Sequence, residues 1–301
     1  GDYFAVVPLD NAYWCQCDEC QKQLAIDEGN IRGEHFNCGT ATHYLWTFVN
    51  NVAKEVKKTH PDKKIAALSY HVYAYLPKDI QLEDNISVAP CLHPRNYWAP
   101  KMKENELAFY KDWIAESGRP IYLWNYLCFP TERGLIQDFN VFPGFNVHAV
   151  SDQIKMYAQD GVRGIFLCGI GEQLDFYATM KLYDDAQTNT DEMVDEFFAL
   201  YFGNVAPAMH DFYDKIESVY ANSVNYPMDI QTREAQFHQT EEIAWKYLGT
   251  EPVMEELAGY MDKAVQLAST PIEKARVESW RTGVWEYMKA GRAKYFSKLE
   301  K

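Results

Sequence analysis

The sequence predicts a mixed α/β fold with a parallel sheet. Short apolar runs alternate with helical patterns or long loops along the first 185 residues, which is the order of a βαβα chain. Each run is almost continuously apolar, as strands are when helices cover both faces of a parallel sheet. The five predicted strands are residues 4–7, 65–70, 86–89, 121–124 and 164–168.

An amphipathic helix is predicted at residues 44–58, because aromatic and valine side chains recur at four-residue spacing from Tyr44 to Val56. Lysines in its last turns favour a helix C-terminus, and the His-Pro-Asp tripeptide that follows ends it. Further helices are predicted at residues 104–116, 147–159 and 173–183, with a long loop at residues 127–145.

From Asp185 onward the helical pattern continues without strand signals. The helices predicted there are residues 191–202, 205–220, 235–248, 252–268 and 271–295. We therefore divide the chain into residues 1–185, which form the α/β part and carry the expected chemistry, and residues 186–301, a helical region packed against it.

Polar and aromatic residues gather after each predicted strand, which in a (β/α)₈ barrel is the face where sites are built. Five βα units are too few to close such a barrel. The sequence therefore predicts a partial TIM-barrel-like fold, the carboxyl-terminal five βα units of eight, whose preceding strands lie on a segment outside this sequence. The alternative is a sheet that stays open or is completed by another chain.

The formal net charge of −14 comes from acidic residues scattered among lysines and arginines. Such a surface repels nucleic acid and anionic membranes, so neither is expected as a partner. No run of ~18 apolar residues is present, which predicts no membrane span, and the first residues lack a signal-peptide pattern. The oligomeric state is left open.

Aromatic residues make up 15% of the chain, and several lie beside predicted turns. This composition suits a carbohydrate partner, because the apolar faces of sugars stack on aromatic rings, but it also suits large helical cores. The candidate substrate-binding residues follow successive strands and are His71, Tyr73, His93, Arg95, Trp98, Trp124, Asn125 and Tyr126. Individually each could be structural, and their recurrence at strand ends favours a sugar subsite.

Two carboxylates are candidates for acid and base catalysis. Asp10 directly follows the first strand, where it could also act as a turn or cap residue. Glu172 follows the last strand within Gly169-Ile170-Gly171-Glu172, where the glycines allow a sharp turn over the sheet; it could instead stabilise the start of the next helix. For Asp18 and Glu19 a solvated or helix-starting role is favoured.

The chain has seven cysteines, an odd number that leaves at least one outside any disulfide within the chain. Cys15, Cys17, Cys20 and Cys38 supply enough thiolates for a tetrahedral zinc site. A disulfide and free thiols lining a pocket are the alternatives. The expectation is no cofactor, with zinc as the exception to test.

Several enzyme classes are disfavoured by missing motifs. The sequence has no Gly-rich phosphate loop, no G-x-S-x-G elbow and no H-E-x-x-H helix. Nucleotide-dependent and serine-hydrolase chemistry are therefore not expected.

The combination of motifs along the chain resembles a known family. These motifs are Trp14-Cys15-Gln16-Cys17-x-x-Cys20, Phe48-Val49-Asn50 before His60-Pro61-Asp62-Lys63, Trp124-Asn125-Tyr126, Gly164-Ile165-Phe166-x-Cys168-Gly169, Lys181-Leu182-Tyr183-Asp184-Asp185, Asp195-Glu196-Phe197-Phe198 and His238-Gln239-Thr240. The family is a bacterial one labelled a domain of unknown function. It is related to alpha-glucuronidases and includes glycoside hydrolase family 163, whose members are endo-beta-N-acetylglucosaminidases.

The resemblance implies a (β/α)₈ barrel in a longer bacterial protein that is exported to the periplasm or the cell surface. It also implies a glycosidase acting on a bacterial, plant or host glycan, with glycans that contain N-acetylglucosamine among the candidates. The last predicted strand lacks the acid that related hydrolases often carry there, so Glu172 would have to supply it. The alternatives are a non-catalytic carbohydrate-binding barrel and a zinc-stabilised structural domain.

Overall fold

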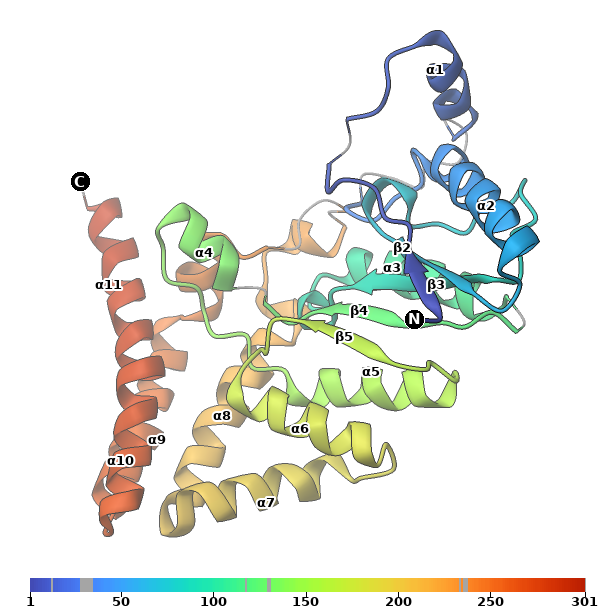
Figure 1. Ribbon diagram of the computed structural model, residues 1–301. Helices are drawn as coiled ribbons and strands as arrows, with labels where there is room; N and C mark the ends of the chain where they lie inside the picture. Colours follow the sequence, from blue (N-terminus) through green and yellow to red (C-terminus); the bar gives the residue numbers. More distant parts are fainter. Residues whose placement is uncertain are drawn as a thin grey trace.

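The computed structural model describes residues 1–11, 13–27, 35–116, 118–128, 131–232, 234 and 238–300. One parallel sheet holds five strands in chain order and curls into a half-barrel (Figure 1). The strands are β1 (Tyr3–Ala5), β2 (Lys64–Ser69), β3 (Ile86–Leu92), β4 (Leu123–Tyr126) and β5 (Ile165–Cys168). The prediction of a mixed α/β fold with a parallel sheet is confirmed.

Neighbouring strands are paired in a register that brings their carboxyl ends to one edge of the sheet. Phe4 pairs with Ile65 between β1 and β2, and Trp124 pairs with Phe166 between β4 and β5. Residues that follow the strands therefore meet along this edge, although they are far apart in the sequence.

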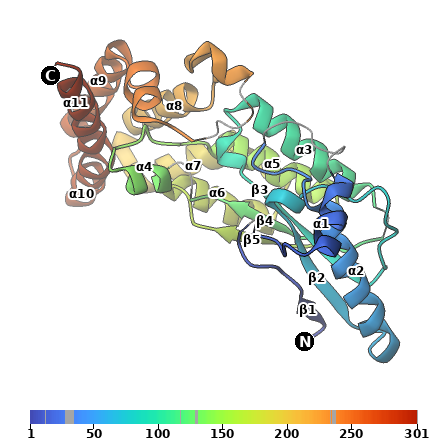
Figure 2. The ribbon, with the colours of Figure 1, turned by 90° about the horizontal axis from the view of Figure 1, so that it is seen from above.

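Helices cover the outer face of the sheet, as Figure 2 shows from above. They are α2 (Thr42–Thr59), α3 (Pro100–Ile114), α5 (Val147–Gln159) and α6 (Gln173–Asp184). Trp46 of α2 and Trp113 of α3 are fully buried and meet with ring centroids 4.7 Å apart. They belong to an apolar core that also contains Ile65 and Val88 of the sheet.

The two faces of the sheet are buried to different degrees. In β2, Ile65 and Ala67 are buried against the helices, whereas Ala66 and Leu68 on the concave face are partly exposed. We expected helices to bury both faces of the sheet. Only the outer face is buried in this way, because the helices α2, α3 and α5 all lie on that side.

Two further helices occur where the sequence pattern predicted loops. Helix α1 (Asp18–Ala25) follows β1, and α4 (Thr131–Gln137) lies within the segment 127–145. The prediction of a loop along the whole of 127–145 was wrong in this part. Helices of seven or eight residues are too short for a 3.6-residue pattern to identify them.

The helical region begins with α7 (Thr190–Phe202) and α8 (Ala206–Tyr220) and ends with α9 (Glu251–Leu267), α10 (Pro271–Trp280) and α11 (Tyr287–Leu299). Two π-helical segments, η7 (Ile243–Leu248) and η8 (Arg281–Glu286), complete it, so the predicted helix at 271–295 is α10, η8 and α11 in succession. Residues 235–237 of the predicted helix at 235–248 lie outside the described residues. Short 3₁₀ helices are η2 (His71–Tyr73), η3 (Pro94–Asn96), η4 (Gly203–Val205), η5 (Ser223–Asn225) and η6 (Met228–Gln231).

One apolar core joins the helical region to the carboxyl-end side of the half-barrel. It contains Trp98 and Phe145, continues through Leu174 of α6 and extends to Phe212 of α8 and Trp245. The division at residue 185 therefore marks a change of pattern in the sequence. It is not a boundary in the packing, because one apolar core contains residues from both sides of it. Within the described ranges, no helix combines the length and apolar character needed to cross a membrane.

Candidate functional site

A hollow of about 610 Å³ runs along the concave face of the half-barrel. Its walls are mainly apolar and aromatic, and a single carboxylate, that of Asp10, is among the residues that form them. The lining residues include Tyr3, Ala5, Leu68, Tyr70, Tyr73, Ala89, Trp124 and Tyr126. This volume falls in the range of small-molecule sites, about 300–1,000 Å³.

Asp10 lies at the carboxyl-end rim of the hollow, where it contacts Tyr70. Burial and then the charge of Asp10, together with a side-chain hydrogen bond, raise the pKa of Tyr70. Tyr70 also exchanges a side-chain hydrogen bond with Tyr126 at the end of β4. An exposed carboxylate is thus linked to two phenols that line the same wall.

His71 follows Tyr70 in an unusual backbone conformation, with φ at +48°. Its N–H donates to Asn37 Oδ1 at 2.8 Å, and its carbonyl accepts from the Cys38 N–H at 2.7 Å. Burial lowers the pKa of the imidazole and so favours the neutral ring, an effect that the negative charge of Asp10 partly opposes. A strained residue beside a carboxylate at a strand end is typical of functional sites.

The floor of the hollow is aromatic. Trp124 stands two residues before Tyr126 on β4, one layer deeper, and its ring centroid lies 4.1 Å from that of Phe166 on β5. Phe166 is 54% exposed, and Trp124 Nε1 has no hydrogen-bond partner among the residues that the structure describes. Trp124 therefore offers the hollow an apolar ring surface, with Phe166 packed beside it, while its unpaired N–H is buried.

His93 lies behind this wall and is 1% exposed. One carboxylate, Glu106 of α3, accepts from the His93 backbone N–H at 2.8 Å and lies 2.7 Å from its Nδ1. The same carboxylate accepts from Tyr97 and Asn37. The His93 ring stacks on Tyr126 with centroids 4.5 Å apart, so it supports the wall of the hollow from outside.

Arg95 is also buried, at 1% exposure, and its donors point to protein groups. Its Nη1 and Nη2 each donate at 2.6 Å, to the carbonyls of Leu127 and Gly144. Its Nε lies 3.2 Å from Asp175 Oδ2, and its Nη2 lies 3.6 Å from Glu172 Oε1. Arg95 therefore joins β4, the following loop and α6.

Asp175 of α6 has no exposed surface, and burial raises its pKa to about 7 even though the charge of Arg95 acts in the opposite direction. Tyr213 of α8 donates to its Oδ1 at 3.3 Å. The residue was not among the sequence candidates, because an acid within a helical stretch is ordinarily solvated.

Glu172 occupies the N-cap position of α6, without a side-chain capping bond. The expected sharp turn is present, since Gly169 has φ +87° and Gly171 has φ +74°. The side chain is 35% exposed and lies beside Arg95. No described contact joins Glu172 to Asp10, which lines a different part of the strand-end edge.

Three other candidates are packed inside the protein. Trp98 stacks on Tyr226 with centroids 4.2 Å apart, and Asn125 lies on the outer face of β4, where it forms a side-chain hydrogen bond with Tyr157. Tyr73 is 3% exposed and borders the hollow from below.

Sequence inspection missed Tyr70, Phe166 and Glu106 as well as Asp175. Period-two alternation along β2 and β5 could have identified Tyr70 and Phe166 as residues of the concave face. For Glu106 and Asp175 the sequence carries no such signal.

No disulfide joins any of the seven cysteines, all of which lie among the described residues. Cys15, Cys17 and Cys20 form a group whose sulfur atoms all lie within 4.8 Å of one another. Cys38 is buried elsewhere, with its sulfur 3.8 Å from Thr40 Oγ1. The structure thus brings together three of the four cysteines considered for zinc.

Comparison with known proteins gives a family but no characterised relative. No curated protein matches the chain, and no solved structure does. One family model matches residues 2–214, which is more than half of the sequence and crosses from the half-barrel into α8. On this match, the chain belongs to the family described as Domain of unknown function (DUF4838).

Proposed function

We propose that this protein is a glycoside hydrolase acting on a glycan, with carboxylates as acid and base. The observation that carries the proposal is Asp10, hydrogen-bonded to Tyr70 beside the strained His71, at the rim of an aromatic hollow. It lies at the carboxyl ends of parallel strands, where enzymes with barrel folds build their sites.

The hollow suits a sugar better than an anionic or highly polar ligand. Apolar faces of sugar rings stack on aromatic side chains, while hydroxyl groups exchange hydrogen bonds with phenols and imidazoles. Trp124 supplies the floor, with Phe166 packed against it, and Tyr70 and Tyr126 supply hydroxyl groups near the rim, where His71 follows Tyr70.

Glycosidases use two carboxyl groups, one that protonates the leaving oxygen and one that attacks the sugar or activates water. We assign these places to Asp10 and Glu172, the exposed and half-exposed carboxylates at the two sides of the strand-end edge. Tyr70 then orients Asp10 through their hydrogen bond, and Arg95 orients Glu172 through its guanidinium.

The candidate binding residues divide between two roles in this proposal. His71, Trp124 and Tyr126 contact the glycan. His93, Arg95, Trp98, Tyr73 and Asn125 hold the walls and the adjoining loops, in accordance with their burial.

The half-barrel is, in the same proposal, part of a (β/α)₈ barrel. Phe4 on β1 is 51% exposed and Phe166 on β5 is 54% exposed, and these strands are the two edges of the sheet. Edge strands with exposed apolar side chains are suited to pair with further strands. Closure of the barrel would cover the floor of the hollow and leave the rim with Asp10 open. The resemblance noted above supports action outside the bacterial cytoplasm.

The test is release of reducing sugar from a panel of complex glycans. We expect turnover by the wild-type protein and loss of at least about 100-fold in Asp10→Asn and in Glu172→Gln. Asp152→Asn is the matched control, because Asp152 is an exposed acid on α5. Full turnover by Asp10→Asn would overturn the assignment of Asp10.

A second function, non-catalytic glycan binding, is favoured by one observation: Asp10 and Glu172 share no described contact, and only Asp10 lines the hollow. Glycan binding that survives in both variants, without turnover by the wild-type protein, is the result expected from a binding protein.

A further inference from the structure

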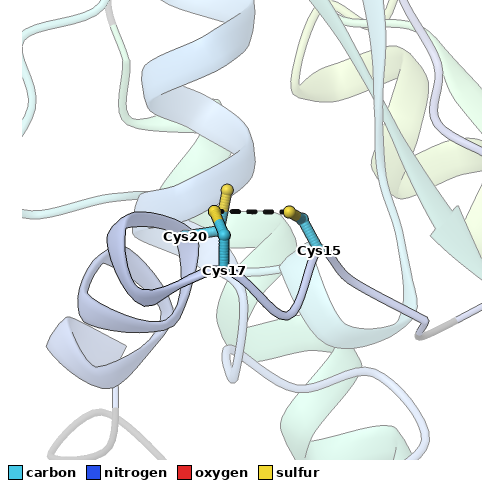
Figure 3. A group of neighbouring side chains, drawn as sticks. All are labelled: Cys15, Cys17 and Cys20. Carbon is cyan, nitrogen blue, oxygen red and sulfur yellow. Dashed lines mark hydrogen bonds between the residues drawn. The ribbon is translucent and has the colours of Figure 1, made fainter.

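Three thiols gather in the segment that follows Asp10 (Figure 3). Cys15 lies in the loop, Cys17 is the N-cap residue of α1, and Cys20 lies in the first turn of that helix. The sulfur atoms of Cys15 and Cys17 are 3.4 Å apart, and all three lie within 4.8 Å of one another. We propose that Cys15, Cys17 and Cys20 bind a zinc ion.

The spacing of the sulfur atoms fits a metal better than a disulfide. Thiolates about 2.3 Å from a tetrahedral zinc ion are about 3.8 Å from each other. The Cys15–Cys17 separation of 3.4 Å is near that value, and the other two separations do not exceed 4.8 Å. A disulfide needs two sulfur atoms about 2.05 Å apart and leaves the third thiol without a role.

Hydrogen bonds hold the loop in this shape. Gln21 donates from its side chain to the carbonyl of Cys15 at 2.7 Å and from its backbone to the carbonyl of Cys17 at 3.0 Å. Tyr44 of α2 donates to the Cys20 sulfur at 3.4 Å, and its ring packs edge-on against Trp14. The thiols are therefore arranged before any ion binds.

Helix α1 needs a stabilising partner that its packing does not provide. It has eight residues and buries none of them. A helix of this length is marginal alone in water. A metal ion at its first turn would anchor it to the loop and, through Tyr44, to α2, as structural metals do in segments with little core.

The ligand set consists of three thiols rather than four. Cys38 is buried at another place, beside Thr40. Three thiolates leave one position of a tetrahedral ion for water or another ligand, and Cys15 and Cys17 are exposed to solvent. Asp18 and Glu19, exposed in the first turn of α1, add negative charge that favours a cation. Soft thiolate ligands select zinc over magnesium or calcium.

Zinc uptake by the reduced, metal-free protein tests the proposal independently of glycan turnover. Equilibrium dialysis against zinc should give one ion per chain, and cobalt in its place should give thiolate-to-metal charge-transfer absorption. Cys15→Ser, Cys17→Ser and Cys20→Ser should each weaken zinc binding at least about 100-fold, whereas Cys38→Ser should retain the ion.

The cobalt spectrum of the wild-type protein needs no variant, so it keeps the test valid if a substitution impairs folding. Absence of zinc uptake by the wild-type protein overturns the proposal. Loss of the ion in Cys38→Ser, or its retention in Cys15→Ser, overturns the three-thiol site. A disulfide mapped between two of these cysteines after purification under reducing conditions does so as well.

Discussion

The carboxyl ends of β1 and β2 differ from that of β3, although all three carry polar residues suited to a site. Asp10 follows the first strand and borders the hollow, and His71 follows the second strand, is partly exposed and is close enough for the charge of Asp10 to act on its pKa. His93 and Arg95 follow β3 and are buried at 1% exposure. We call the strand ends of β1 and β2 the open half of this comparison and that of β3, whose polar residues are buried against protein partners, the closed half.

The partners come from the helices that follow the strands. Glu106 of α3 holds both the backbone and the ring of His93, and Asp175 of α6 pairs with Arg95. No helix carboxylate among the described contacts does the same for His71, whose backbone is held by Asn37. A residue that follows a strand is thereby placed at the carboxyl-end edge of the sheet. Whether its side chain faces the hollow or the protein interior depends on whether a neighbouring helix supplies an acid that binds it, as the comparison of His93 with His71 shows.

The largest effect is expected from removing Arg95. Arg95→Met leaves Asp175 without its buried cation and leaves the carbonyls of Leu127 and Gly144 without donors. We expect a loss of about 3–5 kcal/mol in the free energy of unfolding. Urea denaturation followed by circular dichroism measures it.

Asp10→Asn serves as the control from the open half and should change the free energy of unfolding by less than about 0.5 kcal/mol. Equal, small effects of both substitutions would contradict the division into an open and a closed half. Adding Asp175→Asn to Arg95→Met should restore part of the loss, because it removes the buried carboxyl group that has lost its cation.

Much of the fold could be predicted from the sequence, because each strand is a short apolar run and several long helices, such as α2 and α8, have an amphipathic period. The five strands and helices such as α2 and α8 were found in this way. Helix α4 was missed, since seven residues give too little pattern.

Less of the site could be predicted. The rule that site residues follow strands selected Asp10 and His71, but it also selected the buried His93 and Arg95. It could not separate the two pairs, because burial depends on contacts between segments that are distant in the sequence. The pairing of Glu106 with His93 spans thirteen positions, and that of Asp175 with Arg95 crosses from β3 to α6. Nothing in the single sequence distinguishes these acids from solvated ones.

A smaller effect should come from the backbone of His71, the strained residue of the open half. Its φ of +48° is accessible to glycine without cost but costs other residues about 1 kcal/mol or more. We therefore expect His71→Gly to be more stable than His71→Ala by about 1 kcal/mol, as measured by urea denaturation. Both substitutions remove the imidazole, so the pair isolates the conformation. Equal stability of the two variants would show that the strain is not present in solution.

The smallest expected effect is on the pH dependence of stability and comes from His148. This residue pairs with a glutamate as His93 does, but in a more exposed place, so the two pairs differ mainly in burial. Glu217 accepts from the His148 backbone N–H at 2.9 Å and lies 2.7 Å from its Nδ1. The hydrogen bond to Glu217 is the main cause that raises the pKa of His148 to about 9. A folded-state pKa above the ordinary 6.5 means that this contribution is fully present below pH 6.5 and is lost as the pH rises through 9.

Because the His148 side chain is 44% exposed, solvent screening reduces the contribution to about 1 kcal/mol or less. Unfolding free energies measured between pH 6 and pH 10 should fall by this amount in the wild-type protein, and Glu217→Gln should remove most of the decline. If the decline of the unfolding free energy with pH were unchanged in Glu217→Gln, the half-exposed His148 would gain no stability from its carboxylate. The pairing would then differ in kind from that of the buried His93, whose partner Glu106 also accepts from Tyr97.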